Sequence, residues 1–362
     1  MSNDIDPMAV KLFSFLVFTK LEGAVTSGMI HLGDRLGLYR TLAASIEPIS
    51  IQALASALEL HPRWVEEWAH NQAAAKIVQH HRADDGTELL SLSPEGRIVL
   101  ADEENPAFGM GMFHRLPQTM ESLHHLPESF RTGIGRDYDS HGPEGAVGIE
   151  RSFEPWSNAH LLPTVLPALD GIVERLDAGG SVADIGCGAG GAAVLMGRRF
   201  PNSQIVGYDI SRYALERAGH KKEEAGANNV RFADPRRDPL PDDESLDLVT
   251  AFDCIHDMTH PAEMMSAIRR SLKPDGVWLL VDIKALDTYE ENASQNPMAS
   301  LMYGISVMSC MSSAMSVEGG AGLGTLGLPE STARSMAADA GFTLFRRLDI
   351  DHSVNAFYEV RP

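Results

Sequence analysis

The stretch Val182-Ala183-Asp184-Ile185-Gly186-Cys187-Gly188-Ala189-Gly190-Gly191 decides the fold of this chain. An apolar run typical of a β-strand leads directly into a glycine turn, and a helix is expected over 192–199. Glycine lets the backbone approach a bound nucleoside closely, and the N-terminus of the following helix favours the carboxylate end of a ligand. The segment therefore predicts a strand, turn and helix that bind a nucleoside-containing molecule.

The sequence on the C-terminal side of this stretch alternates between strand and helix patterns. This alternation is typical of a parallel, doubly wound sheet. The last two strands are joined by only a few residues, so they must run antiparallel, because a parallel return needs a long crossover. The predicted fold is an α/β, Rossmann-like domain with a seven-stranded sheet whose last strand is antiparallel; its strands are expected at 181–185, 204–208, 230–232, 246–252, 276–282, 343–349 and 354–360.

The sequence on the N-terminal side of this stretch has a pattern of amphipathic segments that is typical of a mostly helical domain. Amphipathic segments begin at 12–26, Ser50 is a candidate helix cap, and a second helix is expected over 64–77 after the turn at His61-Pro62. Two short strands around Asp84-Asp85-Gly86 complete a winged-helix pattern. We therefore predict a winged-helix-like dimerisation domain over 1–105, a helical connector over 106–165, and a Rossmann-like domain over 166–362 with a lid insertion at about 284–328.

Charge argues against nucleic acid as a partner. The 362 residues carry a net charge of -20, and residues 1–100 hold eight Lys and Arg against twelve Asp and Glu. Such a surface would not condense on phosphate, so we expect this domain to form a homodimer or to wall the substrate pocket rather than to bind DNA. A ligand-sensing transcriptional regulator stays as an alternative that lacks its basic recognition helix.

The remaining composition describes a globular protein without a membrane span. The hydrophobic fraction is 44% and the charged fraction 22%. The acidic start over residues 1–8 does not resemble a signal peptide, which favours a cytoplasmic location. The three cysteines are widely spaced, and His80-His81 and His124-His125 lack partner ligands at useful spacing, so no metal is expected.

The glycine turn by itself is ambiguous, because Gly186, Gly188 and Gly191 also satisfy the dinucleotide pattern of an NAD-dependent oxidoreductase. Asp184 favours a different ligand: it stands where a dinucleotide fold keeps an apolar residue, and its carboxylate can meet the ammonium of an amino-acid moiety. Asp209, after the second strand, can bind ribose hydroxyls of either cofactor.

Residues 184–190 resemble motif I of the class I S-adenosylmethionine-dependent methyltransferases, D-x-G-x-G-x-G. The acidic residue after the third strand, in Ala233-Asp234, and the turn at 272–276 resemble the same family. The resemblance implies that Asp209 binds ribose, that Asp234 approaches the adenine amine, unless it only initiates a turn before Pro235, and that 186–190 line the methionine portion of the donor. The donor-binding residues expected on this basis are Asp184, Gly186, Cys187, Gly188, Gly190, Asp209, Ile210, Ala233, Asp234, Phe252 and Asp253.

The segment Phe252-Asp253-Cys254-Ile255-His256-Asp257-Met258 follows the fourth strand, at the edge where an open α/β sheet binds its ligands. It resembles the histidine-aspartate segment of O-methyltransferases that carry an N-terminal winged-helix dimerisation domain, in which the histidine is the general base. His256 and Asp257 are therefore the predicted catalytic residues. A histidine that only shapes the site or hydrogen-bonds a substrate carboxylate is an equal alternative.

Within these enzymes, the chain resembles S-methyltransferases that convert 4-methylthio-2-hydroxybutyrate to its sulfonium in dimethylsulfoniopropionate synthesis. A thioether nucleophile carries no proton and needs no base, whereas an O-methyltransferase of a phenolic or hydroxylated substrate needs His256 as one. The methionine-rich lid, which includes Met302, is expected to cover the acceptor, although an ordinary buried helix would explain it as well. Other expected substrate contacts lie in the connector: Tyr138, His141, Arg151 and Trp156.

Overall fold

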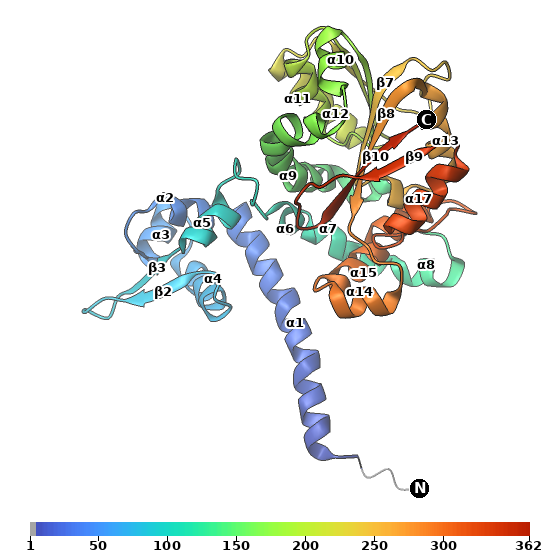
Figure 1. The fold of residues 1–362 in the computed structure, drawn as a ribbon. Helices are drawn as coiled ribbons and strands as arrows, with labels where there is room; N and C mark the ends of the chain where they lie inside the picture. Colours follow the sequence, from blue (N-terminus) through green and yellow to red (C-terminus); the bar gives the residue numbers. More distant parts are fainter. Residues whose placement is uncertain (1–4) are drawn as a thin grey trace. The chain divides into compact units, whose positions relative to one another are not determined.

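The computed structural model describes residues 5–362 and divides the chain into two compact units, 1–117 and 118–362 (Figure 1). Residues 1–4, half of the acidic start at 1–8, lie outside the described residues. The connector expected over 106–165 contributes residues to both units.

The first unit joins helices to a small sheet. Ser50 caps the third helix through its hydroxyl, which accepts a hydrogen bond from the Ala53 amide at 3.1 Å. Tyr39, Leu54, Trp68 and Leu90 pack in its core. The sheet has the order β1-β3-β2 and is antiparallel. The elements are α1 (Pro7–Arg35), α2 (Leu38–Ala44), β1 (Ile49–Ser50), α3 (Ile51–Ala57), α4 (Pro62–Ala74), β2 (Gln79–Arg82), β3 (Glu88–Ser91), α5 (Pro94–Ala101) and α6 (Gly111–His114).

The connector region is a chain of short helices that ends in one longer helix. Helix α7 (Leu116–Glu121) spans the boundary between the units. A long helix, α9, continues into a π-helical turn, η3, at its C-terminus. The elements between α7 and the sheet are η1 (Ser122–His124), α8 (Leu126–Thr132), η2 (Tyr138–His141), α9 (Gly142–His160), η3 (Leu161–Val165), η4 (Leu166–Ala168) and α10 (Ile172–Ala178).

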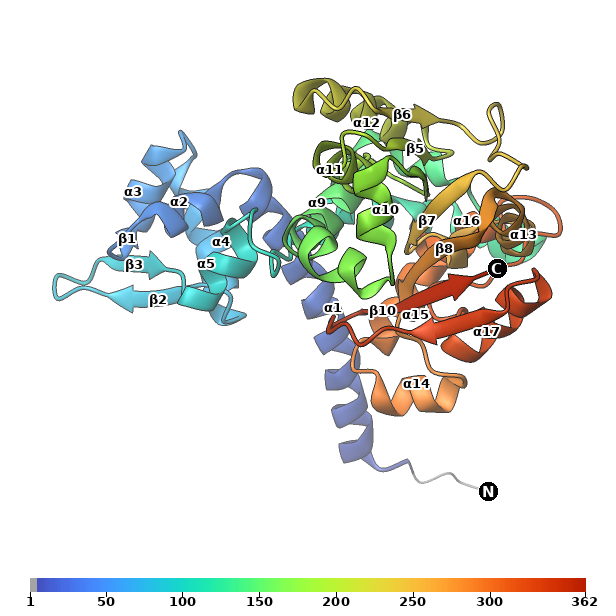
Figure 2. The ribbon, with the colours of Figure 1, turned by 45° about the horizontal axis from the view of Figure 1, so that its top comes forward.

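A seven-stranded sheet organises the second unit in the order β6-β5-β4-β7-β8-β10-β9 (Figure 2). Neighbouring strands from β6 to β8 are parallel, and β10 runs antiparallel to both β8 and β9. This arrangement confirms the predicted Rossmann-like fold. The strands are β4 (Ser181–Ile185), β5 (Gln204–Tyr208), β6 (Val230–Ala233), β7 (Leu246–Phe252), β8 (Leu272–Ile283), β9 (Leu344–Arg347) and β10 (Asn355–Arg361).

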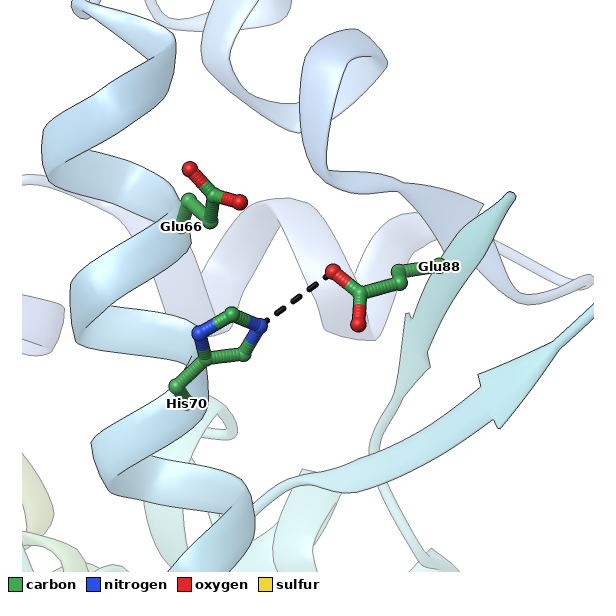
Figure 3. A group of neighbouring side chains, drawn as sticks. All are labelled: Glu66, His70 and Glu88. Atoms are coloured by element: carbon green, nitrogen blue, oxygen red, sulfur yellow. Dashed lines mark hydrogen bonds and ion pairs between the residues drawn. The ribbon is translucent and has the colours of Figure 1, made fainter. Parts of the chain in front are cut away.

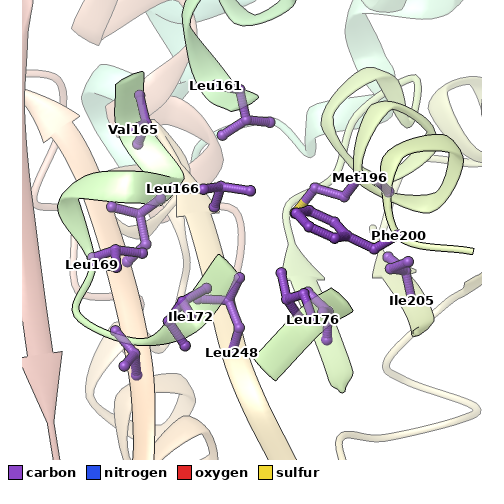
Figure 4. Packing of buried hydrophobic residues seen from close by; sticks show 14 of the residues in the cluster. Leu161, Val165, Leu166, Leu169, Ile172, Leu176, Met196, Phe200, Ile205 and Leu248 are labelled. Carbon is purple, nitrogen blue, oxygen red and sulfur yellow. The ribbon is translucent and has the colours of Figure 1, made fainter. Parts of the chain in front are cut away.

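Alternate residues of the strands pack into two separate cores, one on each face of the sheet. Val182 and Leu248 belong to the core that contains Met196 and Phe200 near helix α11 (Gly191–Arg199), shown in Figure 4. The next residues along the strands join the other core, against α13 (Pro261–Ser271) and α17 (Glu330–Asp339). Helix α12 (Arg212–Ala225) follows β5. Because both faces are covered, ligands reach this sheet at the carboxyl ends of its strands.

The insertion expected as a lid folds into three helices between β8 and α17. They are α14 (Tyr289–Gln295), α15 (Ala299–Met308) and α16 (Cys310–Ala314), and a short 3-10 turn, η5 (Ile255–Asp257), lies against α16. Thr288 and Glu291 form a reciprocal capping box that starts α14. Within residues 5–362 the structure contains no helix with the length and apolar character that crossing a bilayer requires.

Candidate active site

The glycine turn after β4 requires glycine at its central positions. Gly186, Gly188 and Gly190 have φ angles of 64°, 54° and 77°, in the left-handed region that side chains disfavour. A Cβ atom at position 186 would lie 2.5 Å from Cβ of Cys254, and one at position 190 would collide with the ring of Phe232. The turn is thus fixed by sterics as well as by backbone conformation, and the Gly190 amide closes it through a hydrogen bond to the Cys187 carbonyl at 2.9 Å.

Asp184 is a buried carboxylate with one oxygen left for a ligand. Thr250 donates a hydrogen bond to Oδ1 at 2.6 Å, while Oδ2 finds no hydrogen-bond partner among residues 5–362. Burial raises the pKa of Asp184 to about 7, the Thr250 hydrogen bond opposes that rise, and the charge of Asp209 adds to it. A buried acceptor without a donor costs stability, and an ammonium group at Oδ2 would satisfy it. The site therefore fits the amino-acid end of S-adenosylmethionine.

Asp209 ties the end of β5 to the glycine turn. Its two carboxylate oxygens accept hydrogen bonds from the amides of Gly188 and Ser211, both at 2.8 Å. Burial raises the pKa of Asp209, and the two backbone hydrogen bonds oppose the shift. Each oxygen keeps a second lone pair, so ribose hydroxyls can still donate to it. Of the other predicted donor-binding residues, Ile210 follows Asp209 in the chain. The amide of Cys187 donates a hydrogen bond to the carbonyl of Tyr208, the residue before Asp209, at 3.0 Å.

Asp234, at the end of β6 after Ala233, initiates a turn. Its carboxylate accepts hydrogen bonds from the backbone amide and guanidinium of Arg236, and the same guanidinium bonds the carbonyl of Ile210 at 2.8 Å. The hydrogen bond from Arg236 lowers the pKa of Asp234. Asp234 therefore initiates the turn before Pro235, and Arg236 links it to Ile210. Arg236 was not among the residues predicted from the sequence.

His256 and Asp282 form a buried pair at the carboxyl ends of β7 and β8. Nδ1 of His256 lies 2.6 Å from Oδ1 of Asp282, and both side chains are at most 3% exposed. Burial alone would lower the pKa of His256, but the Asp282 carboxylate and then the Cys310 side chain raise it well above the ordinary value. The Asp282 carboxylate therefore favours the protonated form of His256.

Asp253 and Asp257 flank this pair. Asp253 has a φ of 49° and its carboxylate accepts a hydrogen bond from Asn355. Burial, together with the charge of Asp282, raises the pKa of Asp253 to about 7. The charge of Asp257 contributes to the raised pKa of both Asp253 and Cys254. Asp257 ends the η5 turn, which follows Phe252 at the carboxyl end of β7.

The insertion packs against the turn that carries His256. Helix α16, which begins at Cys310, contacts η5, and the amide of Gly324 donates a hydrogen bond to the His256 carbonyl at 3.1 Å. The adjacent Ser309 hydroxyl lies 3.1 Å from Nε2 of His141 in the connector. The structure thus brings His256 and His141 to the same short lid segment.

The other predicted substrate residues are more scattered. Tyr138 stacks edge-on against His141 at 6.1 Å between ring centroids. Trp156 instead packs against His160, His352 and Phe357, in the core side of α9. Met302 accepts a contact from the side-chain amide of Asn296 at 3.4 Å. Arg151 lies on α9, in sequence between Glu150 and Glu154, which both form ion pairs with Lys221. Met311 and Met315 line an apolar hollow of about 120 Å³ between the lid and α8, which no predicted donor-binding residue borders.

Sequence reasoning missed Thr250, Asp282, Cys310 and Asn355. Asp282 carried a usable signal, because it is the last carboxylate of a buried strand that ends beside the His256 strand. Thr250 lies opposite Asp184 in the β4 and β7 pairing, so a correct strand order would have identified it. Cys310 had no comparable signal.

Residues 176–322 match the model of a family described as a methyltransferase domain. A sterol 24-C-methyltransferase from Gibberella zeae is 34% identical over 121 residues, which are 31% of each chain. An uncharacterized 37.1 kDa protein from a Streptomyces fradiae transposon is 30% identical over 208 residues, which cover 56% of this chain and 58% of that protein. The chain thus spans only 31% of the sterol methyltransferase's length and little more than half of the longer match.

Solved structures extend the likeness to the whole fold. Human N-acetylserotonin methyltransferase in complex with S-adenosylmethionine superposes with a TM-score of 0.69 at 17% identity, covering 100% of this chain and 99% of that one. The mitomycin 7-O-methyltransferase gives a TM-score of 0.70 at 18% identity, over 98% and 99% of the two chains. Residues 176–322 of the second unit are thus similar to a methyltransferase-domain family, and the solved methyltransferases share the fold of the whole chain.

Proposed function

We propose that the chain transfers a methyl group from S-adenosylmethionine to a small thioether acid, with 4-methylthio-2-hydroxybutyrate as the acceptor. The observation that carries the choice of acceptor is the state of His256. It is buried and paired with Asp282 through Nδ1 at 2.6 Å, and the Asp282 carboxylate raises its pKa and so favours the protonated ring. A protonated imidazole cannot remove a proton from a hydroxyl, but it can donate a hydrogen bond to a carboxylate.

The chain's own residues account for donor binding. Asp184 Oδ2 would accept the donor's ammonium, Asp209 its ribose hydroxyls, and the Gly186 to Gly190 turn would pack along its methionine portion. The bound donor supplies a methyl group on a positively charged sulfur. The neighbouring carboxylates of Asp184, Asp209 and Asp253 favour that cation electrostatically.

A thioether acceptor makes the smallest demand on these residues. Its sulfur carries no proton, and total charge is conserved when the methyl group passes from one sulfur to another. The protein then has to align the two sulfur atoms and exclude water. His256 and His141, which meet at the lid segment Ser309-Cys310, are the polar groups we assign to the acceptor's carboxylate and hydroxyl.

The test combines binding, turnover and pH. The protein is titrated calorimetrically with S-adenosylhomocysteine and assayed with 4-methylthio-2-hydroxybutyrate and with a panel of small phenols between pH 6 and 9. We expect sulfonium product and, with the donor saturating at every pH, a rate that does not rise with pH above 7. His256→Gln should raise KM more than it lowers kcat, and His260→Gln, an exposed histidine four residues away, should leave both unchanged.

The second candidate is an O-methyltransferase with His256 as general base. It is favoured by the short Nδ1 to Oδ1 distance, which orients the imidazole as a base dyad requires. In that case phenols are turned over, the rate rises with pH as His256 loses its proton, and His256→Gln lowers kcat by about 100-fold or more. That result would overturn the thioether assignment while leaving the methyltransferase assignment intact. Absence of S-adenosylhomocysteine binding would overturn both.

For the first unit, we infer a homodimerisation domain of the winged-helix type. The helix pair α3 and α4, followed by the β2 and β3 hairpin, matches that pattern. Helix α1 carries exposed apolar side chains along most of its length, which is unusual for a surface that faces water. They are Met8, Val10, Leu12, Phe13, Phe15, Leu16, Val17, Phe18, Leu21 and Val25.

A further inference from the structure

Helix α4 and the β2 and β3 hairpin bring together side chains that methyl transfer does not use. Glu66 and His70 stand four residues apart on α4, so they share one face of the helix. Glu88, the first residue of β3, reaches across to the same face, as Figure 3 shows. Nε2 of His70 lies 3.2 Å from Oε2 of Glu88, and one ligand atom of each of the three residues lies within 4.8 Å of the other two.

We propose that Glu66, His70 and Glu88 form a binding site for a divalent cation of the zinc class. The donor set is one imidazole nitrogen and two carboxylate oxygens, which suits Zn²⁺, with water completing the coordination. Zinc bonds of about 2.1 Å in a tetrahedral site separate neighbouring ligand atoms by about 3.4 Å. The 3.2 Å between His70 and Glu88 is close to that spacing, and only the Glu66 side chain has to move inward.

The surroundings hold Glu88 in the required orientation. Its other oxygen, Oε1, is engaged by Nε2 of His80 at 3.3 Å and by the Arg82 guanidinium at 3.1 Å. This leaves Oε2 facing His70. Glu66 has only a loose contact of 3.7 Å with Arg63, whose guanidinium pairs more closely with Glu67, so the Glu66 carboxylate can turn toward the site.

The site is open enough to load and bridges two separate elements. The side chains of Glu66, His70 and Glu88 are 41%, 45% and 26% exposed, so a hydrated ion can enter without unfolding the domain. A bound ion would add coordination bonds between α4 and the hairpin to the existing contacts of His70 with Glu88 and His80. Zinc should therefore stabilise the first unit.

The experiment uses the full, untagged chain after treatment with a chelator. Zn²⁺ is titrated calorimetrically into the wild type and into His70→Ala and Glu88→Gln, with two matched controls. Glu67→Gln alters the neighbouring carboxylate on the same helix, and His81→Ala alters the hairpin histidine that bonds Ser91 instead. We expect one Zn²⁺ per chain in the wild type and both controls, and affinity at least about tenfold weaker in the two site variants.

Two further measurements keep the result interpretable. Circular dichroism without metal checks that each variant is folded, and thermal unfolding should show a zinc-dependent rise in Tm that His70→Ala loses. Co²⁺ bound at this site should give a visible spectrum without a thiolate charge-transfer band, because no cysteine is a ligand. Absence of saturable binding, equal affinity in His70→Ala, or a thiolate band would each overturn the proposal.

Discussion

At the scale of single residues, Asp184 connects burial to donor affinity. Burial raises its pKa to about 7, and the carboxylate must be ionised to hold an ammonium group. We therefore expect the Kd for S-adenosylhomocysteine to increase as the pH falls from 8 to 6. Asp184→Asn should weaken binding about tenfold or more and remove this pH dependence. Calorimetry at three pH values measures both effects, with Asp177→Asn, an exposed carboxylate paired with Arg199, as the control.

The raised pKa of Asp184 also makes the stability of the ligand-free protein depend on pH. Its pKa is about 7 in the folded chain against 3.8 as the ordinary value, so the folded state binds the proton more tightly. The stability it contributes is complete below about pH 4 and is lost as the pH rises through 7. Asp184→Asn should therefore raise Tm relative to wild type more at pH 8 than at pH 5, measured by calorimetric unfolding. An equal difference at both values would contradict the raised pKa.

At the scale of elements, the strands of the large sheet were predictable because each is a buried apolar run with glycine or proline nearby. The expected bounds of β4, β5 and β7 coincide with those observed. Strand β8 begins earlier than expected, since Leu272 pairs with Leu246 ahead of the main ladder. Helix α1 is about twice as long as predicted, because its apolar residues lie on all sides and provide no periodicity from which to read its ends.

The site could be predicted only where its chemistry is local in sequence. The glycine turn and Asp184 belong to one continuous motif, and Asp209 follows the next strand. The His256 partner, by contrast, lies 26 residues away on the neighbouring strand, and Cys310 comes from an inserted helix. The Glu66, His70 and Glu88 cluster likewise depends on how the hairpin folds back onto α4, which the spacing of the three residues does not indicate.

The lid packs closely against the connector at Gly135, and a single added methyl group should disturb this contact. The amide of Gly135 bonds the Met315 carbonyl at 2.8 Å, and a Cβ atom at position 135 would overlap the Ser312 carbonyl oxygen. Gly135→Ala should therefore displace α16, increase hydrogen exchange at 310–315 and raise the acceptor KM. Gly304→Ala is the matched control, because it lies in the same lid with open space around its Cβ position. Unchanged exchange in Gly135→Ala would show that α16 does not depend on this contact.

At the scale of the whole molecule, the charge and the apolar surface point to different partners. The net charge of -20 opposes binding to nucleic acid, whereas α1 exposes a continuous apolar surface. Phe15 and Phe18 are 70% and 64% exposed, and burying such side chains typically contributes about 2 kcal/mol each. A second copy of the chain offers the same apolar helix and can cover it symmetrically.

This difference leads to a prediction about assembly. The wild-type chain should sediment as a dimer at micromolar concentration, and Phe15→Glu combined with Phe18→Glu should shift it to monomer, because each substitution removes apolar contact and would bury a charge. Lys20→Glu introduces the same acidic side chain at an exposed polar position of α1 and should leave the dimer in place. Sedimentation velocity gives the masses, and circular dichroism shows whether the variants keep their helices. A monomeric wild type, or a dimer that survives both phenylalanine substitutions, would mean that α1 is covered by something other than a second copy of this chain.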